Sequence, residues 1–138
     1  MEEKIALATI GDDLYKTELV ARKHHLLADE PIEAGGKDAG PRPGDFLRMS
    51  LASCTAITLR MYANRKGFSV NKITVEVTSK EVEGGTAFDT DIQIFGDLQE
   101  AERQRMLQIA KLCPVHKALT RPIQINTMLS VINESSKA

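Results

Sequence analysis

Apolar residues are concentrated in one long stretch, residues 46–62, which reads FLRMSLASCTAITLRMY. A helix with this sequence is apolar on most faces, so we expect it to be central and to be covered by the other elements. Pro43-Gly44-Asp45 is typical of its beginning, and Lys66-Gly67 is typical of its end. Because 138 residues are few for covering such a helix, the pattern also favours an oligomer.

Three short antiparallel strands are predicted before this helix. Residues 5–10 and 14–20 flank a turn at Gly11-Asp12-Asp13, and His25-Leu26-Leu27 form the third strand. The next segment, residues 29–43, is rich in Pro, Gly and charge. It is too long for a simple connection, so we expect it to be either mobile or functional.

After the helix, apolar and polar positions alternate in two runs, residues 70–78 and 88–95, around a turn at Glu83-Gly84-Gly85. Strict alternation of this kind is typical of a β-hairpin with one polar face.

A second helix is expected after Gly96, with Asp97 as its N-cap and Glu100 as the capping partner. It must break or kink at Cys113-Pro114, because proline cannot donate the next backbone hydrogen bond. A short helix over residues 114–119 and a closing strand over residues 123–131 complete the chain. The separate runs of strands and helices predict an α+β fold, and the length predicts a single domain over residues 1–138.

Charge and composition exclude several classes of function. The net charge is −1, and acidic and basic residues are interspersed, so no field attracts nucleic acid or an anionic membrane. The acidic start Met1-Glu2-Glu3 is unlike a secretory signal, and Arg48 and Arg60 interrupt the apolar stretch, which argues against a membrane span. We therefore expect a cytoplasmic protein. In that compartment two distant cysteines form a redox-active pair, a metal site or two unrelated buried thiols.

Helical geometry defines the surroundings of Cys54 in the central stretch. Arg48 and Arg60 point about 120° away from it, and Asp45 points to the opposite side, about 13 Å along the axis. Any charged partner of Cys54 must therefore come from another element or another chain, and we expect both arginines at the surface or at dimer contacts. The residues within about 60° of the Cys54 direction are apolar or carry a hydroxyl: Leu47, Ser50, Leu51, Ile57, Thr58 and Met61.

Cys113 has a different context. An apolar pocket alone raises the pKa of a thiol, so a reactive cysteine needs a cation or free backbone donors nearby. Cys113 directly precedes Pro114 and the expected short helix, whose first backbone donors favour a thiolate there. The alternative is that both cysteines are buried small hydrophobic residues, as most free cysteines are. His116 is either solvated or hydrogen-bonded near Cys113.

A metal site is poorly supported. Cys113 and His116 have the spacing of half a site, and His24 or His25 could join them with Cys54, but no second motif completes the ligand set. The sequence therefore predicts neither a metal nor an organic cofactor.

The run LADEPIEAGGKDAGPRPGDFLRMSLASCTAITLRMYANRKG, with the later GDL and CPVHKAL, resembles the OsmC/Ohr family. The similarity is greatest to its branch with CTAxTLRMYA and CPVHxxL motifs, and it covers nearly the whole chain. It implies an α+β fold with antiparallel sheets around long central helices. It also implies an intertwined homodimer with shared active sites at the subunit interface.

The resemblance further implies a thiol-dependent peroxidase acting in oxidative-stress defence. Cys54 would attack an organic hydroperoxide, and Cys113 would resolve the resulting sulfenic acid as a disulfide. A dithiol, such as a lipoyl group, would be the reductant. The alternative is a non-catalytic dimer of the same fold that binds an apolar small molecule in the pocket over Cys54.

Asp45 stands where the family carries a glutamate shortly before the first cysteine, and the resemblance places this carboxylate across the dimer interface. The other interpretation is an acid at the start of the helix, where it complements the helix dipole. No residue matches the family's activating arginine, and Arg22 and His25 on the N-terminal strands are the candidates for a supporting role. A cation able to hold Cys54 as thiolate would separate the peroxidase from the non-catalytic alternative.

Overall fold

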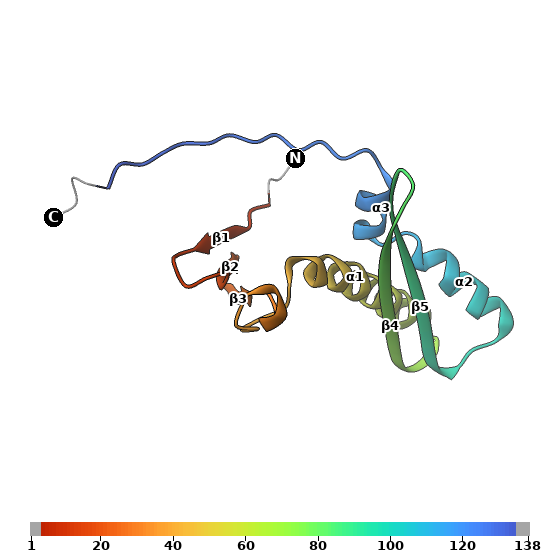
Figure 1. The fold of residues 1–138 in the computed structure, drawn as a ribbon. Coiled ribbons are helices and arrows are strands. Elements are labelled where there is room, and N and C mark those ends of the chain that lie inside the picture. The colour runs from red at the N-terminus through yellow and green to blue at the C-terminus, as the bar shows by residue number, and fades with distance from the viewer. Residues whose placement is uncertain (1–3, 135–138) are drawn as a thin grey trace.

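The computed structural model describes residues 4–134, and its longest element is helix α1, Pro43–Lys66 (Figure 1). Proline occupies its first helical position, where no backbone donor is needed. At the other end Gly67 adopts φ 71°, and its N–H donates to the carbonyls of Ala63 and Asn64. This left-handed conformation suits glycine, which has no Cβ to clash. Both predicted ends of the helix are confirmed.

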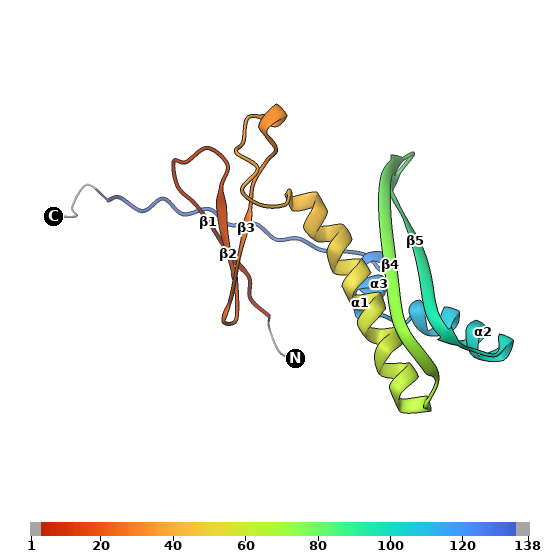
Figure 2. The same cartoon turned by 90° about the horizontal axis from the view of Figure 1, so that it is seen from below.

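The N-terminal strands form an antiparallel sheet in the order β1-β2-β3, as predicted. It lies beyond the first turn of α1, away from the hairpin and from α2 (Figures 1 and 2). Leu7, Ile10 and Leu26 are each more than half exposed on it, so the described part of the chain leaves apolar side chains uncovered on both faces. The strands are β1 (Leu7–Ile10), β2 (Thr17–Ala21) and β3 (His24–Ala28).

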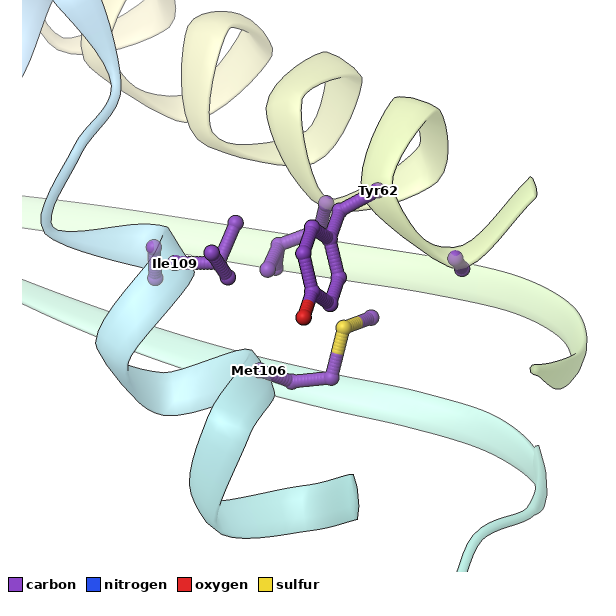
Figure 3. Packing of buried hydrophobic residues seen from close by; sticks show 6 residues of the cluster. Tyr62, Met106 and Ile109 are labelled. Atoms are coloured by element: carbon purple, nitrogen blue, oxygen red, sulfur yellow. The ribbon is translucent and has the colours of Figure 1, made fainter. Parts of the chain in front are cut away.

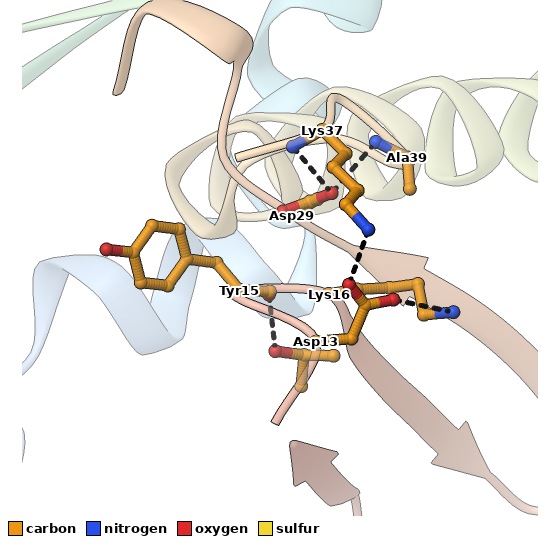
Figure 4. A network of polar contacts seen from close by, with 7 residues as sticks. Asp13, Tyr15, Lys16, Asp29, Lys37 and Ala39 are labelled. Carbon is orange, nitrogen blue, oxygen red and sulfur yellow. Dashed lines mark hydrogen bonds and ion pairs between the residues drawn. The ribbon is translucent and has the colours of Figure 1, made fainter. Parts of the chain in front are cut away.

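The segment between this sheet and α1 is held by hydrogen bonds and contains a short 3-10 helix, η1, Ile32–Ala34. Asp29 is only 2% exposed, and its carboxylate accepts the backbone N–H of Glu30. It also accepts the backbone N–H groups of Lys37 and Ala39 (Figure 4). Lys37 Nζ also contacts Asp13 Oδ1 at 2.7 Å, which joins the segment to the β1–β2 turn. The segment therefore folds back onto the N-terminal sheet.

The predicted hairpin is confirmed and is longer than expected, with β4 at Ser69–Val82 and β5 at Gly85–Asp97. Gly84 has φ 83° at the second position of the turn, a left-handed conformation that favours glycine. Ile73 pairs with Ile94 and Val75 with Ile92, and these residues are half-buried while their polar neighbours are exposed. The hairpin thus has one polar face, and it runs along α1 (Figure 2).

The core forms where α1 crosses α2, Glu100–Ala110 (Figure 3). Tyr62 meets the Phe68 ring edge-on at a centroid distance of 5.8 Å, and its hydroxyl accepts a bond from Arg105 Nε at 3.0 Å. Its ring is therefore buried while its polar end stays satisfied. The buried cluster consists of Leu59, Tyr62, Ala63, Met106, Ile109 and Ala110.

The predicted start of the second helix is wrong. Gln99 is the N-cap, and its backbone N–H donates to Glu102 Oε1 at 2.9 Å. Asp97 pairs with Ser69 as the last residue of β5, so it cannot also cap the helix. The short helix α3 extends over Pro114–Thr120, close to its predicted bounds.

The predicted closing strand over residues 123–131 is also wrong, because these residues form neither helix nor strand. They leave α3 toward the side of the N-terminal sheet, away from the hairpin (Figures 1 and 2). A strand needs a neighbouring strand for its hydrogen bonds, and among residues 4–134 this path provides none. Ile125, Met128 and Leu129 are each more than four-fifths exposed.

Helix α1 is covered on one side only, so the expectation that it is enclosed fails within a single chain. Leu51, Thr55 and Leu59 are buried, whereas Ile57 and Met61 on the other side are 55% and 67% exposed. The hairpin, α2 and α3 all contact α1, and they leave these apolar side chains exposed.

Candidate active site

Two helices bring Cys54 and Cys113 together. Cys54 lies near the middle of α1 and is partly exposed, while Cys113 is the N-cap of α3 and is 0% exposed. Helix α3 packs against α1, and the two sulfurs are neighbours that alter each other's pKa. Both cysteines are free thiols.

Pro114 determines the position of Cys113. Helix α2 ends at Ala110, and Cys113 follows with extended backbone angles of φ −58° and ψ 135° before α3 begins at Pro114. In this N-cap conformation, Cys113 Sγ accepts the backbone N–H of His116 at 3.4 Å. His116 therefore contacts Cys113 through its backbone, and its side chain is half-buried.

The surroundings of the two thiols favour a thiolate at Cys113. Burial alone would raise the pKa of Cys113, yet this pKa is lowered because Cys54, the His116 N–H and the Thr55 hydroxyl stabilise the thiolate. Burial raises the pKa of Cys54, and the neighbouring Cys113 raises it further. Within one chain, these surroundings therefore favour the thiolate at Cys113 over the thiolate at Cys54.

Two threonines of α1 accompany the cysteines. Thr58 interacts with Cys54, as the helical geometry predicted. Thr55 interacts with Cys113 and was missed, because it points about 100° away from Cys54. The available signal was a hydroxyl on the buried face, four residues from both Leu51 and Leu59.

Asp45 forms hydrogen bonds at the start of α1. Its Oδ2 accepts the backbone N–H of Arg42 at 3.0 Å, and Arg48 Nη2 contacts its Oδ1 at 2.6 Å. The Arg48 guanidinium, and then the Arg42 N–H, lower the pKa of Asp45. Asp45 lines a groove beside β4 together with Val75 and Val77. These contacts agree with the interpretation of Asp45 as a helix N-terminal acid, and its catalytic role stays a prediction.

Arg48 and Arg60 attach α1 to β4 while their side chains remain partly exposed, and their expected place at dimer contacts stays a prediction. Arg48 Nη1 donates to Ser79 Oγ at 2.9 Å, and Arg60 Nη1 donates to the carbonyl of Val70 at 3.0 Å. A long side chain pointing sideways from the helix reaches the strand that runs beside it.

Within one chain, Arg22 and His25 do not join the cysteine pair. Arg22 lies in the β2–β3 turn with φ 53°, and His25 is exposed on β3 opposite Val20. Their sheet lies beyond the first turn of α1, whereas Cys54 is near its middle (Figure 1). Their supporting role stays a prediction that depends on a second chain.

Residues 4–134 contain neither a group of metal-ligating side chains nor a membrane-spanning helix. No three His, Cys, Asp or Glu side chains in this range are grouped so that they could hold a metal ion. None of the helices in the same range combines the length and the apolar character needed to cross a bilayer.

Residues 35–128 match the model of a family described as OsmC-like protein. Among solved structures, the chain resembles an OsmC-like protein from Mycoplasma pneumoniae, with 21% identity, a TM-score of 0.72, and coverage of 86% of this chain and 87% of that chain. It also resembles the organic hydroperoxide resistance protein OsmC from Legionella pneumophila, with 21% identity, a TM-score of 0.61, and coverage of 87% and 90%.

A third similar structure is the organic hydroperoxide resistance protein OhrB of Bacillus subtilis, with 19% identity, a TM-score of 0.57, and coverage of 86% of this chain and 91% of that chain. No curated protein matches the sequence. At these identities the structural similarities establish the α+β fold.

Proposed function

Because the chain belongs to the OsmC-like protein family, we propose that it is a thiol-dependent peroxidase that reduces organic hydroperoxides through Cys54 and Cys113. The observation that carries this proposal is the meeting of two free thiols from α1 and α3, one partly exposed and one buried. Structural relatives named organic hydroperoxide resistance proteins support the choice of substrate.

The proposed chemistry has three balanced steps. The Cys54 thiolate attacks the peroxide ROOH, the O–O bond breaks, and RO⁻ leaves and takes a proton to become the alcohol ROH. Cys54 is then a sulfenic acid. The Cys113 thiolate attacks its sulfur, so a disulfide forms and hydroxide leaves as water after taking a proton. A dithiol reductant supplies two electrons and two protons and restores both thiols.

The exposure of the two cysteines supports the proposed division of roles. A peroxide can reach Cys54, which is partly exposed, but it cannot reach Cys113, which is 0% exposed. The lowered pKa of Cys113 suits a thiol that must attack a neighbouring sulfur. Apolar side chains expected beside Cys54 include Ile57 and Met61, and both are exposed in one chain. They favour an organic peroxide over hydrogen peroxide.

Activation of Cys54 requires a cation from outside its own chain. Burial raises the pKa of Cys54. The arginines of its own helix bind other groups: Arg48 donates to Ser79 and Asp45, and Arg60 donates to the carbonyl of Val70. In the proposed homodimer, the N-terminal sheet of one subunit would bring Arg22 or His25 to Cys54 of the other. Asp45 would then orient that cation. The exposed apolar residues of α1, the sheet and residues 121–134 support such a dimer.

One observation favours a second candidate, a non-catalytic dimer that binds an apolar small molecule over Cys54. The raised pKa keeps Cys54 protonated in a single chain, and a protonated thiol is a poor nucleophile. Without a cation from the partner, the site would bind apolar ligands and leave peroxides unchanged.

Peroxide consumption by the purified protein separates the two candidates. We expect the wild type to consume cumene hydroperoxide in the presence of dihydrolipoamide or dithiothreitol. Cys54→Ser should abolish consumption, whereas Cys113→Ser should allow one turnover that ends in a trapped sulfenic acid. Ser53→Ala, on the exposed face next to Cys54, is the matched control and should retain the wild-type rate. A wild type that consumes no peroxide with either dithiol contradicts the peroxidase proposal.

A further inference from the structure

Thr55 places a buried hydroxyl group beside the cysteine pair. None of the three proposed chemical steps uses this hydroxyl. The residue is 2% exposed, on the side of α1 that the rest of the chain covers. Its Oγ1 donates to the carbonyl of Leu51 at 2.8 Å, and the same hydroxyl is one of the groups that lower the pKa of Cys113. A hydroxyl has a single proton, so it cannot donate to both groups at once.

The Leu51 carbonyl can release this proton at little cost. In an α-helix, that carbonyl also accepts the backbone N–H of residue 55, so it keeps a partner when the hydroxyl turns away. Cys113 has a greater need for a donor when it is charged. It is fully buried, its Sγ accepts the His116 N–H at a long 3.4 Å, and a buried charge without hydrogen bonds is costly.

We propose that Thr55 is a positioning residue for Cys113, with a hydroxyl proton that points to the Leu51 carbonyl beside the thiol and turns to the sulfur beside the thiolate. Rotation about the Thr55 Cβ–Oγ1 bond moves only the hydrogen, so α1 keeps its place. The inference rests on the proposed function, in which the Cys113 thiolate attacks oxidised Cys54. Once the disulfide forms, the negative charge is gone and the proton returns to Leu51.

Other groups around Cys113 must be considered in any pH-dependent experiment. From α1, the Cys54 thiol is its titratable neighbour. On α3, His116 and Lys117 follow in the first turn, and from α2 the C-cap residue Lys111 is exposed. A Cys54→Ser background leaves Cys113 as the single thiol and keeps a hydroxyl at position 54.

The test is a titration of the Cys113 thiolate by its ultraviolet absorbance as pH is varied, in the full-length Cys54→Ser protein. Thr55→Val removes the hydroxyl at nearly constant volume, so the midpoint should move to higher pH and the thiolate fraction at neutral pH should fall about tenfold. Thr55→Ser keeps the hydroxyl and should restore the midpoint. Thr58→Val removes the hydroxyl beside residue 54 and should leave the Cys113 midpoint unchanged.

An unchanged midpoint in Thr55→Val would overturn the inference, and so would an equal shift in Thr55→Ser, which would indicate a packing effect. If Thr55→Val does not fold, Thr55→Ala compared with Thr55→Ser gives the same contrast. The titration uses no peroxide, so its result is independent of turnover. If Thr55→Val shifts the midpoint as expected but the wild-type protein consumes no peroxide, the proposed function is contradicted and the inference about Thr55 is not.

Discussion

At the scale of residues, the helical geometry of α1 predicts which side chains of the same helix surround Cys54, but it cannot predict what surrounds Cys113. This geometry places Thr58 on the Cys54 side of α1, which the structure confirms. It does not indicate Thr55, because Thr55 points about 100° away from Cys54. The second cysteine approaches from α3 over the neighbouring face of α1, and the direction of that approach depends on tertiary packing.

Leu59 is the residue whose loss should cost most stability. It is fully buried in the cluster with Met106 and Ile109, so Leu59→Ala leaves a cavity between α1 and α2. We expect the free energy of unfolding to fall by about 3 kcal/mol, measured by urea denaturation at a fixed protein concentration.

Leu107→Ala is the matched control for this substitution, since Leu107 lies on α2 and is about half exposed. Its expected cost is below about 1 kcal/mol. Equal losses in the two variants would show that the α1–α2 contact does not form the centre of the core.

At the scale of elements, the segment between β3 and α1 depends on Asp29. Three backbone N–H groups donate to this carboxylate, and the bond from Ala39, with those from Glu30 and Lys37, lowers its pKa from the ordinary 3.8. A lowered pKa stabilises the folded state above the unfolded value, and the stabilisation is lost as pH falls through the folded value.

We therefore expect Asp29→Asn to lower the melting temperature at neutral pH and to reduce the loss of stability below about pH 4. Thermal unfolding followed by circular dichroism across this pH range measures both effects. Glu33→Gln, in the exposed η1 helix, is the control and should change neither. If the melting temperature of Asp29→Asn depends on pH as that of the wild type does, Asp29 does not organise the segment.

The bounds of elements were predictable where the signals are local. Pro43 and Gly67 mark the ends of α1, and Pro114 marks the start of α3, because proline and glycine restrict or free the backbone at their own positions. The start of α2 was misjudged, since Asp97 looks like a cap in sequence but is paired with Ser69 across the hairpin. That pairing is seen only in the register of β4 and β5 in the folded hairpin.

At the scale of the whole molecule, one chain leaves too much apolar surface uncovered. Met61 on α1, Leu26 on the N-terminal sheet and Met128 near the C-terminus are all more than half exposed. A surface of this kind marks an association site. Residues 123–131 pair with no strand in the part of the chain that the structure describes, which is why the predicted closing strand is wrong.

We expect light scattering after size exclusion to give a molar mass twice the 15.2 kDa of the chain. Removal of residues 122–138 should shift the protein toward the monomer, and Met61→Glu should do the same because it places a charge on the apolar face of α1. Glu76→Gln on the polar face of the hairpin is the control and should stay dimeric. A wild-type mass of one chain would contradict a shared active site.

Mass spectrometry of the thiols after addition of one equivalent of cumene hydroperoxide tests the central claim most directly. The account predicts an intramolecular disulfide between Cys54 and Cys113 in the wild type, and a sulfenic acid on Cys54 in Cys113→Ser. Unmodified thiols in the wild type, or a sulfenic acid on Cys113 with Cys54 intact, would contradict it.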